Sequence, residues 1–402
     1  MKIALINTLY YPYKIGGAEK SVQLLAEGLL QAGHDVFVIT LDKPEELLRQ
    51  DMVNGVRVYR VPLRNIYWPF DDLKKKPHVA FRAIWHYLDR YNGKMKSMVY
   101  EILRSEQPSI VHTHNLVGFS VSAWDAAKSL GLPLLHTMRD YSLICPKGMY
   151  KKGKNCPVPC KVCSMFSRIK RAFSKKVDLA VGISRFTLNK HVEHGFFPVS
   201  KHDFIYNPVP MVYKKLVNGL RMESNFCIGY LGRLAPNKGV EDIIDAVEEL
   251  KGEIPIRFFI AGSGKTEYEQ TLRKRAEGLP VEFLGYVKPE ELFRLIHCLV
   301  VSSRWHEPFG RVIIEAFAYA IPVIASNRGG IPEIVDEGQT GWLYDPDIPG
   351  DLERALIKAY TNRRDIAEMG QRVREKVQDF TVEKHVQRYL NWYENLTDRS
   401  KK

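Results

Sequence analysis

The sequence predicts an α/β protein with two domains, each built around a parallel sheet. Short apolar runs alternate with longer amphipathic segments along most of the chain, which is the βαβ pattern of a sheet covered by helices on both faces. The alternation stops at Asn207-Pro208-Val209-Pro210 and starts again at Phe226. With 402 residues, of which 45% are hydrophobic, the chain is long and apolar enough to fill two cores.

In the first half, each short apolar run predicts a strand and each amphipathic segment predicts a helix. The expected strands are 3–6, 36–40, 56–61, 109–111, 134–137 and 179–181, and the expected helices are 18–32 and 82–104. Helix 18–32 is followed by Gly33, a residue type that suits the position after a helix.

The second half repeats the pattern. Its expected strands are 226–231, 256–260, 281–284 and 298–302, and its expected helices are 240–251, 266–276, 289–296 and 381–396. We therefore expect one domain at 1–205, a second at 206–380 and a C-terminal helical segment at 381–402. Because ligands of parallel sheets bind beyond the carboxyl ends of the strands, the site is expected in the cleft between the two domains.

The segment from His306 to Glu315 is the most informative for function. A loop with a Pro-Phe-Gly turn ends at Gly310 and a helix is expected to begin near Arg311, so that Glu307 lies in the loop and Glu315 in the helix. The free N–H groups of a helix start hold anions. Two carboxylates beside an anion site suit a ligand with both hydroxyls and phosphates, such as a nucleotide sugar. The alternative is a capped surface helix with two solvated glutamates.

Several further motifs accompany this segment in a fixed order. They are Gly229-Tyr-Leu-Gly-Arg233-Leu-Ala-Pro-Asn-Lys238-Gly239, Phe259-Ile-Ala-Gly262-Ser-Gly264, Phe283-Leu-Gly285-Tyr-Val287, Gly329-Gly-Ile-Pro-Glu333 and Gly338-Gln-Thr-Gly-Trp342. With the Glu-x7-Glu segment, they resemble the retaining GT-B glycosyltransferases of family GT4, also called glycosyltransferase group 1. The resemblance extends from Met1 to about Leu390 and is strongest in the second half.

The resemblance implies a GT-B fold, in which two Rossmann-like domains face each other across a cleft. The first domain would bind the acceptor, the second would bind the nucleotide sugar, and the last helix would cross back to the first. The implied reaction moves a sugar from a nucleoside diphosphate, UDP or GDP above all, to a hydroxyl of a lipid-linked or polysaccharide acceptor. Anomeric configuration would be retained, and no metal or other cofactor would be needed for catalysis.

The resemblance also implies roles for individual residues. Arg233 and Lys238 would neutralise the diphosphate, which suits cations placed after a strand. Glu307 would bind sugar hydroxyls and Glu315 the ribose. The remaining implied donor contacts come from loop backbone at Gly17, Gly262, Val287, Phe309, Gly310 and Arg311.

One position departs from the family pattern. Many members carry Thr-x-His-Asp at the end of a first-domain strand, and the histidine is important for catalysis. Here the segment is Thr137-Met-Arg139-Asp140, while His136 lies earlier and is expected inside the strand. Arginine is not a base at neutral pH, but it stabilises phosphate or orients a sugar. In the front-face route implied by the resemblance, the departing phosphate takes the acceptor proton, so no protein base is required.

Four cysteines lie close together in the sequence, with the spacing Cys145-x10-Cys156-x3-Cys160-x2-Cys163. Four thiolates with turn residues between them suit a structural tetrahedral zinc ion, although the first spacing is irregular. Free thiols and disulfides are the alternatives, and disulfides are disfavoured in a cytoplasm.

Charge is concentrated in the first half. Residues 1–205 carry 31 Lys and Arg against 17 Asp and Glu, a net charge of +14, whereas residues 206–402 carry 28 against 29. The segment Lys147–Lys176 has ten basic and no acidic residues, with Phe166, Ile169 and Phe173 among them. Anionic lipid headgroups attract such segments by about 1 kcal/mol per cation. We therefore expect an anionic membrane surface as a partner; a soluble basic loop is the alternative, and no nucleic-acid recognition motif accompanies the charge.

No apolar run approaches the ~18 residues that span a bilayer, and residues 1–7 lack the pattern of a signal peptide. The expected location is cytoplasmic, at the inner face of the membrane. Two other functions fit the same sequence. One is a GT-B nucleotide-sugar epimerase or phosphorylase, of which an epimerase would give product without an acceptor. The other is a catalytically silent basic binding protein, which would bind no nucleotide sugar.

Overall fold

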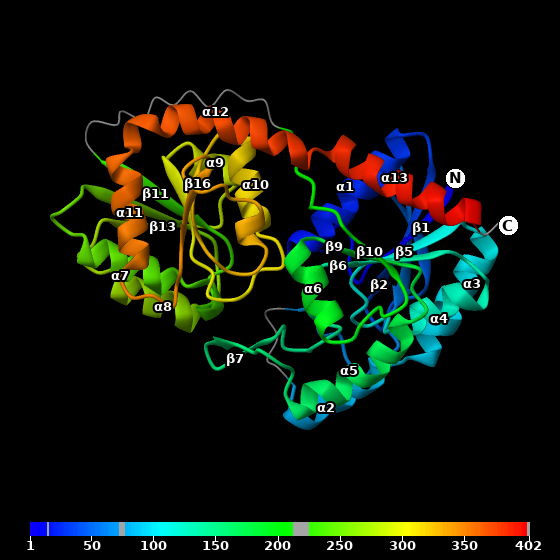
Figure 1. The fold of residues 1–402 in the computed structure, drawn as a ribbon. Helices are drawn as coiled ribbons and strands as arrows, with labels where there is room; N and C mark the ends of the chain where they lie inside the picture. Colours follow the sequence, from blue (N-terminus) through cyan, green and yellow to red (C-terminus); the bar gives the residue numbers. More distant parts are fainter. Residues whose placement is uncertain (14–15, 72–76, 212–224, 400–402) are drawn as a thin grey trace. The chain divides into compact units, whose positions relative to one another are not determined.

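The computed structural model describes residues 1–13, 16–71, 77–211 and 225–399, and its contacts divide the chain into two units (Figure 1). The first unit comprises Met1–Met149, Cys156–Pro208 and the chain from Val382, and the second comprises Tyr150–Asn155 and Val209–Thr381. These bounds differ from the expected ones in three places. The two divisions fall after Pro208 and Thr381 rather than after residues 205 and 380. Residues 150–155 belong to the second unit although they lie within the first half of the sequence.

The first unit contains an eight-stranded sheet in the order β10-β9-β6-β5-β1-β2-β4-β3. All neighbouring strands pair in parallel except β3, which is antiparallel to β4. The strands are β1 (Lys2–Ile6), β2 (Asp35–Asp42), β3 (Arg49–Val53), β4 (Val56–Pro62), β5 (Ile110–Thr113), β6 (Leu134–Met138), β9 (Leu179–Gly182) and β10 (Lys201–Phe204).

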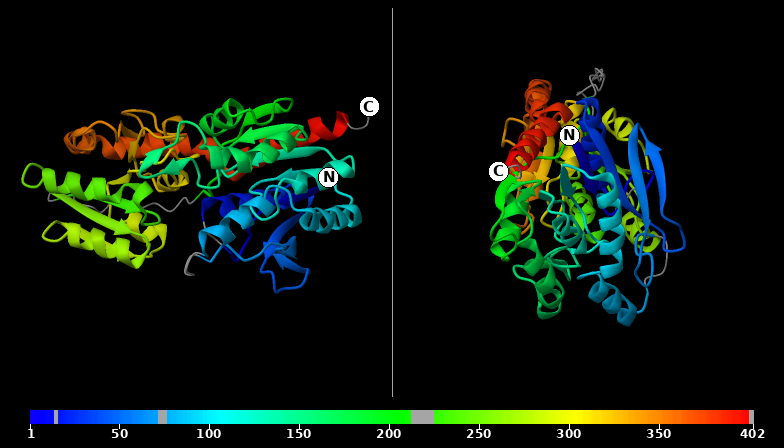
Figure 2. Two further views of the ribbon diagram at one scale, coloured as in Figure 1. Left: turned by 90° about the horizontal axis from the view of Figure 1, so that it is seen from below. Right: turned by 90° about the vertical axis from the view of Figure 1, so that its right-hand side faces the viewer.

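Helices pack on both faces of this sheet (Figures 1 and 2). They are α1 (Gly17–Gln31), α2 (Val79–Leu88), α3 (Gly93–Glu106), α4 (Ser122–Ser129), α5 (Lys161–Ser174), α6 (Arg185–Glu193) and α13 (Val382–Arg399). In the described part of the chain, no helix combines the length and the hydropathy needed to cross a bilayer.

The C-terminal helix α13 packs against α1 and the sheet of the first unit. A Cβ atom on Gly28 of α1 would lie 2.6 Å from Cγ2 of Val386, so the close approach of the two helices requires glycine. A buried hydrogen-bonded chain runs from the Tyr393 hydroxyl to His112 Nδ1 (2.6 Å) and from His112 Nε2 to the Thr137 hydroxyl (2.7 Å). The Thr137 hydroxyl also bonds that of Tyr389 at 2.9 Å, which ties α13 to β5 and β6. Residues 400–402 of the expected C-terminal segment lie outside the described residues.

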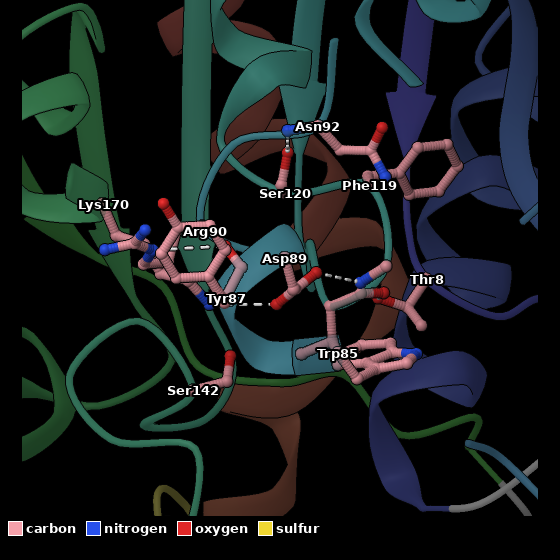
Figure 3. Close-up of polar contacts among 12 residues, drawn as sticks. Thr8, Trp85, Tyr87, Asp89, Arg90, Asn92, Phe119, Ser120, Ser142 and Lys170 are labelled. Carbon is pink, nitrogen blue, oxygen red and sulfur yellow. Dashed lines mark hydrogen bonds and ion pairs between the residues drawn. The ribbon is translucent and has the colours of Figure 1, made fainter. Parts of the chain in front are cut away.

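The prediction of one helix over 82–104 is wrong, because the chain breaks between α2 and α3. Asp89 turns inward, accepts a hydrogen bond from the Gly118 backbone N–H at 2.6 Å and forms a buried ion pair with Lys170 Nζ at 3.1 Å (Figure 3). Asn92 then caps α3 by accepting a hydrogen bond from the Met95 N–H at 3.3 Å. Helix α3 therefore begins anew at Gly93.

The basic segment Lys147–Lys176 is not a solvated loop. It forms a short hairpin of β7 (Tyr150–Lys151) and β8 (Lys154–Asn155), followed by α5. Lys170 is buried against Asp89, Lys176 pairs with Asp125, and Phe166 is buried. Part of the expected membrane-facing charge is thus neutralised within the first unit, and Phe166 does not face solvent.

The second unit contains a six-stranded parallel sheet in the order β13-β12-β11-β14-β15-β16. Numbered within the unit, this is the order 3-2-1-4-5-6 of a dinucleotide-binding fold. Its strands are β11 (Phe226–Leu231), β12 (Ile256–Ala261), β13 (Val281–Gly285), β14 (Cys298–Val301), β15 (Val323–Ser326) and β16 (Gly341–Tyr344). Its α-helices are α7 (Val240–Glu249), α8 (Thr266–Arg275), α9 (Pro289–Phe293), α10 (Arg311–Ala318), α11 (Asp351–Thr361) and α12 (Ile366–Lys376).

Candidate active site

In the second unit, the loops after β11 and β14 meet at the point where the strand order reverses. This switch point is where parallel sheets of this order bind ligands. The Ser302 hydroxyl, just after β14, donates a hydrogen bond to the Lys238 carbonyl at 2.8 Å. The backbone N–H of Arg304 donates to the Asn237 carbonyl at 3.1 Å. These bonds place the expected diphosphate-binding loop beside the loop that carries Glu307.

Lys238 and Glu307 form a partly buried ion pair between these loops. The Lys238 Nζ atom also lies 5.7 Å from the centroid of the Trp305 ring, a distance within reach of a cation–π contact. Arg233 is exposed, and its backbone carbonyl accepts a hydrogen bond from the Tyr230 hydroxyl at 2.8 Å. Burial raises the pKa of Tyr230, and the charge of Glu307 adds to the rise, so Tyr230 is a neutral donor. The loop after β11 therefore presents two cations and is held in place by a buried phenol.

Glycines bring the ends of three strands together on the same edge. The Gly262 N–H donates to the Gly285 carbonyl at 2.7 Å, and a Cβ atom on Gly262 would lie 1.8 Å from the Gly232 carbonyl oxygen. Any side chain at Gly262 would therefore separate the loops after β11 and β12. Val287 follows β13 on the same edge and is half-buried beside an exposed Tyr286.

Helix α10 begins where the sequence indicated, immediately after Gly310. The Phe309 side chain is buried, with its ring centroid 6.1 Å from that of Phe380, so only its backbone is available to a ligand. Arg311 Nε donates to Glu315 Oε1 at 2.8 Å. Neither glutamate of the motif is an isolated solvated side chain, since Glu307 and Glu315 each have a cationic partner.

The hairpin β7–β8 adds a residue to this site that sequence reasoning missed. The Asn155 side-chain amide donates to the Arg304 carbonyl at 2.7 Å and accepts from the His306 N–H at 2.9 Å. All three residues belong to the second unit. Asn155 therefore holds the backbone that leads directly into Glu307. The local signal was weak: Lys152 and Gly153 have positive φ and form the hairpin turn, but nothing nearby indicates which backbone Asn155 meets.

In the first unit, the structure places Gly17 at the start of α1 and Arg139 immediately after β6. Arg139 is buried; its Nε donates to His114 Nδ1 at 3.2 Å and its Nη1 to Asn207 Oδ1 at 2.7 Å. The expected core position of His136 agrees with its burial and its contact with the Thr113 hydroxyl at 2.9 Å.

His114 is a second residue that sequence reasoning missed. It follows β5, and with Arg139, Met138 and Asp140 it lines a pocket of about 10 Å³. Burial lowers the pKa of His114 well below its usual value, and the neighbouring His112 and Arg139 lower it further. The imidazole is therefore neutral, and its Nε2 has no hydrogen-bond partner among the described residues. The strand end Val111-His112-Thr113-His114 was the available signal, because carboxyl ends of parallel strands carry site residues.

The four cysteines of the first unit do not form an evident ligand set. Cys145 and Cys163 are buried with their sulfur atoms 3.2 Å apart, while Cys156 is half-buried and Cys160 is exposed. Burial raises the pKa of the Cys163 thiol, and the Cys145 and Cys160 thiols add to the rise. Over the described ranges, no group of three or more His, Cys, Asp or Glu side chains is arranged to hold a metal ion. The zinc site stays a prediction.

Family models match both halves of the chain. One described as "Glycosyl transferases group 1" matches residues 216–376, and one described as "Glycosyltransferase Family 4" matches residues 15–212. An "Uncharacterized 42.6 kDa protein in cps region" of Klebsiella pneumoniae is 38% identical over 83% of this chain and 87% of its own length. The chain belongs to the group 1 glycosyltransferases. An uncharacterized glycosyltransferase of Methanocaldococcus jannaschii is 28% identical over 99% of both chains.

Solved structures agree with the GT-B fold of this glycosyltransferase. Sucrose-phosphate synthase from Thermosynechococcus elongatus aligns with a TM-score of 0.76 and 20% identity over 99% of both chains. The Anabaena protein HepE, solved in complex with UDP-glucose, aligns with a TM-score of 0.70 and 19% identity over 98% of this chain and 100% of that one. The fold expected from the sequence is confirmed.

Removing the Asn155 amide is expected to disturb catalysis by the glycosyltransferase more than donor binding. Asn155→Ala should lower kcat roughly tenfold, because it removes two hydrogen bonds that hold the backbone before Glu307. Each of them has a net contribution of about 0.5–1.5 kcal/mol. The donor KM should change less. Steady-state kinetics test this, with Lys154→Ala as the control, since Lys154 is exposed on the same hairpin. An unchanged kcat in Asn155→Ala would contradict the positioning role.

The zinc prediction is tested on the purified glycosyltransferase. We expect about one zinc per chain by elemental analysis, and its loss in the Cys160→Ser/Cys163→Ser variant, because a structural site needs its thiolates. Absence of metal, together with alkylation of all four thiols in the folded protein, would rule the site out.

Proposed function

We propose that this glycosyltransferase moves a sugar from a nucleoside diphosphate to a hydroxyl of a lipid-linked or cell-surface polysaccharide acceptor, with retention of anomeric configuration. It would do so while held peripherally at the cytoplasmic face of an anionic membrane. In this reaction the bond from the anomeric carbon to the diphosphate breaks and the bond to the acceptor oxygen forms. The acceptor proton passes to the departing phosphate.

The Lys238–Glu307 pair at the switch point of the second unit is the observation that carries the proposal. Diphosphate bound there would meet the Lys238 ammonium and the Arg233 guanidinium, which stabilise the charge that develops on the leaving group. Glu307, held by its ion pair with Lys238, would accept hydrogen bonds from sugar hydroxyls. Glu315, paired with Arg311 at the start of α10, would accept those of the ribose.

In this proposal, polar groups of the first unit contact the acceptor and the sugar. Arg139 takes the place of the family's histidine, and the neutral imidazole of His114, just after the neighbouring strand β5, lies beside it. We propose that this pair positions the transferring sugar, with the imidazole as a hydrogen-bonding group rather than a base, because its lowered pKa leaves it a weak proton acceptor. Uridine nucleotides are the first candidates for the donor, since HepE was solved with UDP-glucose.

The decisive experiment has two stages. A thermal-shift panel of UDP, GDP, ADP and TDP sugars first identifies the donor, because a bound ligand raises the melting temperature. Transfer to a soluble acceptor analogue is then followed by NMR, which reports the anomeric configuration of the product. Inverted configuration would refute retention. Conversion of the donor without an acceptor would favour an epimerase, and no stabilisation by any of the sugars would count against the donor site.

A further inference from the structure

Helix α2 has an unusual distribution of side chains. A surface helix of a soluble protein normally turns its apolar stripe inward and its polar face outward. In α2 every exposed residue is apolar, including Val79, Phe81, Ile84, Tyr87 and Leu88. Its inward and half-buried positions hold Arg82, Trp85 and His86. The side chains that ordinarily cover a core here face solvent, and Phe81 is 57% exposed.

Helix α5 packs beside α2 and extends this surface. The His86 and Phe166 ring centroids lie 5.9 Å apart, and the buried Asp89–Lys170 pair links α5 to the residue that follows α2. Figure 1 shows the two helices together at one end of the first unit. On α5, Val162 and Met165 are 60% and 52% exposed, so apolar side chains continue from one helix to the other.

Cations surround these apolar side chains without opposing charge from the same two segments. Lys161, Arg168 and Lys175 are exposed on or beside α5, and the Arg90 guanidinium stacks 3.8 Å from the centroid of Tyr87 (Figure 3). Residues 77–98 and 156–176 contain a single acidic residue, Asp89, which is buried and paired. A surface with exposed aliphatic and aromatic groups among cations is complementary to a bilayer of anionic lipid, whose headgroups are negative and whose interior is apolar.

We infer that the outward face of α2, together with Val162 and Met165 of α5, is a membrane-docking surface that inserts apolar side chains between anionic lipids. The inference rests on the proposed function and deepens it, because it assigns the docking to the outward face of α2 and the exposed side chains of α5 beside it, rather than to the whole basic segment Lys147–Lys176. The charges of Lys161, Arg168 and Lys175 attract the docking surface to the anionic headgroups. Phe81 and Ile84 enter the boundary between the headgroups and the acyl chains. Salt screens the electrostatic attraction but does not weaken the apolar insertion.

The test compares vesicle binding of three forms of the full chain. The wild type should sediment with phosphatidylcholine vesicles that contain phosphatidylglycerol, and a fraction should stay bound at about 1 M salt, where charge is screened. Phe81→Asp/Ile84→Asp should lower the partition coefficient at least about tenfold, because two apolar contacts are replaced by charges that the headgroups repel. The control Leu47→Asp/Met52→Asp should bind like the wild type, since Leu47 and Met52 are 81% and 63% exposed in the same unit but lie just before and within β3, outside α2 and α5.

Several outcomes would overturn the inference. Wild-type binding by Phe81→Asp/Ile84→Asp, or an equal loss in the control, would show that the α2 face is not the contact. A wild-type dimer that Phe81→Asp/Ile84→Asp makes monomeric, seen by light scattering, would assign the face to a second copy of the chain. Transfer to a soluble acceptor is measured in parallel. Loss of vesicle binding with normal transfer separates docking from the donor site, and loss of transfer with normal docking would refute only the proposed function.

Discussion

Replacing Lys238 by alanine is expected to slow sugar transfer at least about 100-fold, the scale for removing charge stabilisation from a transition state. The substitution removes the ammonium that pairs with Glu307 at the switch point and also leaves that carboxylate without its partner. Arg233→Ala should have an effect of the same order, because it takes the second cation from the diphosphate loop. Initial rates with the donor found by thermal shift, measured at saturating acceptor, give both values.

Matched variants test whether the slower sugar transfer in Lys238→Ala and Arg233→Ala is caused by a change at the proposed donor site. Lys358→Ala removes a cation from an exposed ion pair with Glu337 in the same unit, and transfer should stay near the wild-type rate. Glu307→Ala should reduce transfer more than it reduces binding of the free nucleoside diphosphate, because its proposed contacts are with the sugar. Turnover close to wild type in both Arg233→Ala and Lys238→Ala would remove the basis of the assignment.

Asp89→Ala is expected to lower the free energy of unfolding by about 3–5 kcal/mol, because it leaves the Lys170 ammonium buried without its partner. The carboxylate also accepts the Gly118 N–H, which would lose its bond (Figure 3). Burial raises the pKa of Asp89 and the nearby Lys170 charge lowers it in part, so the pair itself offsets the cost of burying the carboxylate. Urea unfolding followed by circular dichroism measures the loss.

Two further variants separate the buried pair from a general effect of charge. Asp89→Ala/Lys170→Met should recover part of the stability, since an apolar pair carries no uncompensated charge. Arg104→Ala breaks an exposed pair with Glu101 on α3 and should cost less than about 1 kcal/mol. A loss below that value in Asp89→Ala would mean that Lys170 finds solvent or another partner.

The elements that the sequence predicted well are those determined by local patterns. The run Phe226–Leu231 is a strand with the expected ends, and α10 begins at Arg311, because Gly310 and the apolar spacing after it act within a few residues. The features that were missed depend on distant partners. The break after α2 follows from a carboxylate that meets Lys170, 81 positions along the chain. Asn155 bonds backbone 149 and 151 positions away, which no local pattern reveals.

The same dependence on partners distant in the sequence limited the prediction of the candidate site. The motifs that resemble the family suggested Arg233, Lys238, Glu307 and Glu315 as candidate residues, but they did not indicate that each carboxylate would pair with a cation. The basic segment was interpreted from its charge alone, while folding buries Lys170 and exposes the apolar face of α2 instead. Composition located the charge in the first half of the chain, but it did not indicate which cations are buried or paired in the fold.

Because the hairpin 150–155 belongs to the second unit, the polypeptide passes between the two units after residues 149, 155, 208 and 381. The second unit, which we propose binds the donor, is thus not one continuous stretch of the chain. A chimera that exchanges only residues 209–381 with a relative would keep the recipient's hairpin against a foreign loop 304–306. We expect such grafts to need residues 150–155 from the same parent, so donor specificity and this short insertion should be inherited together.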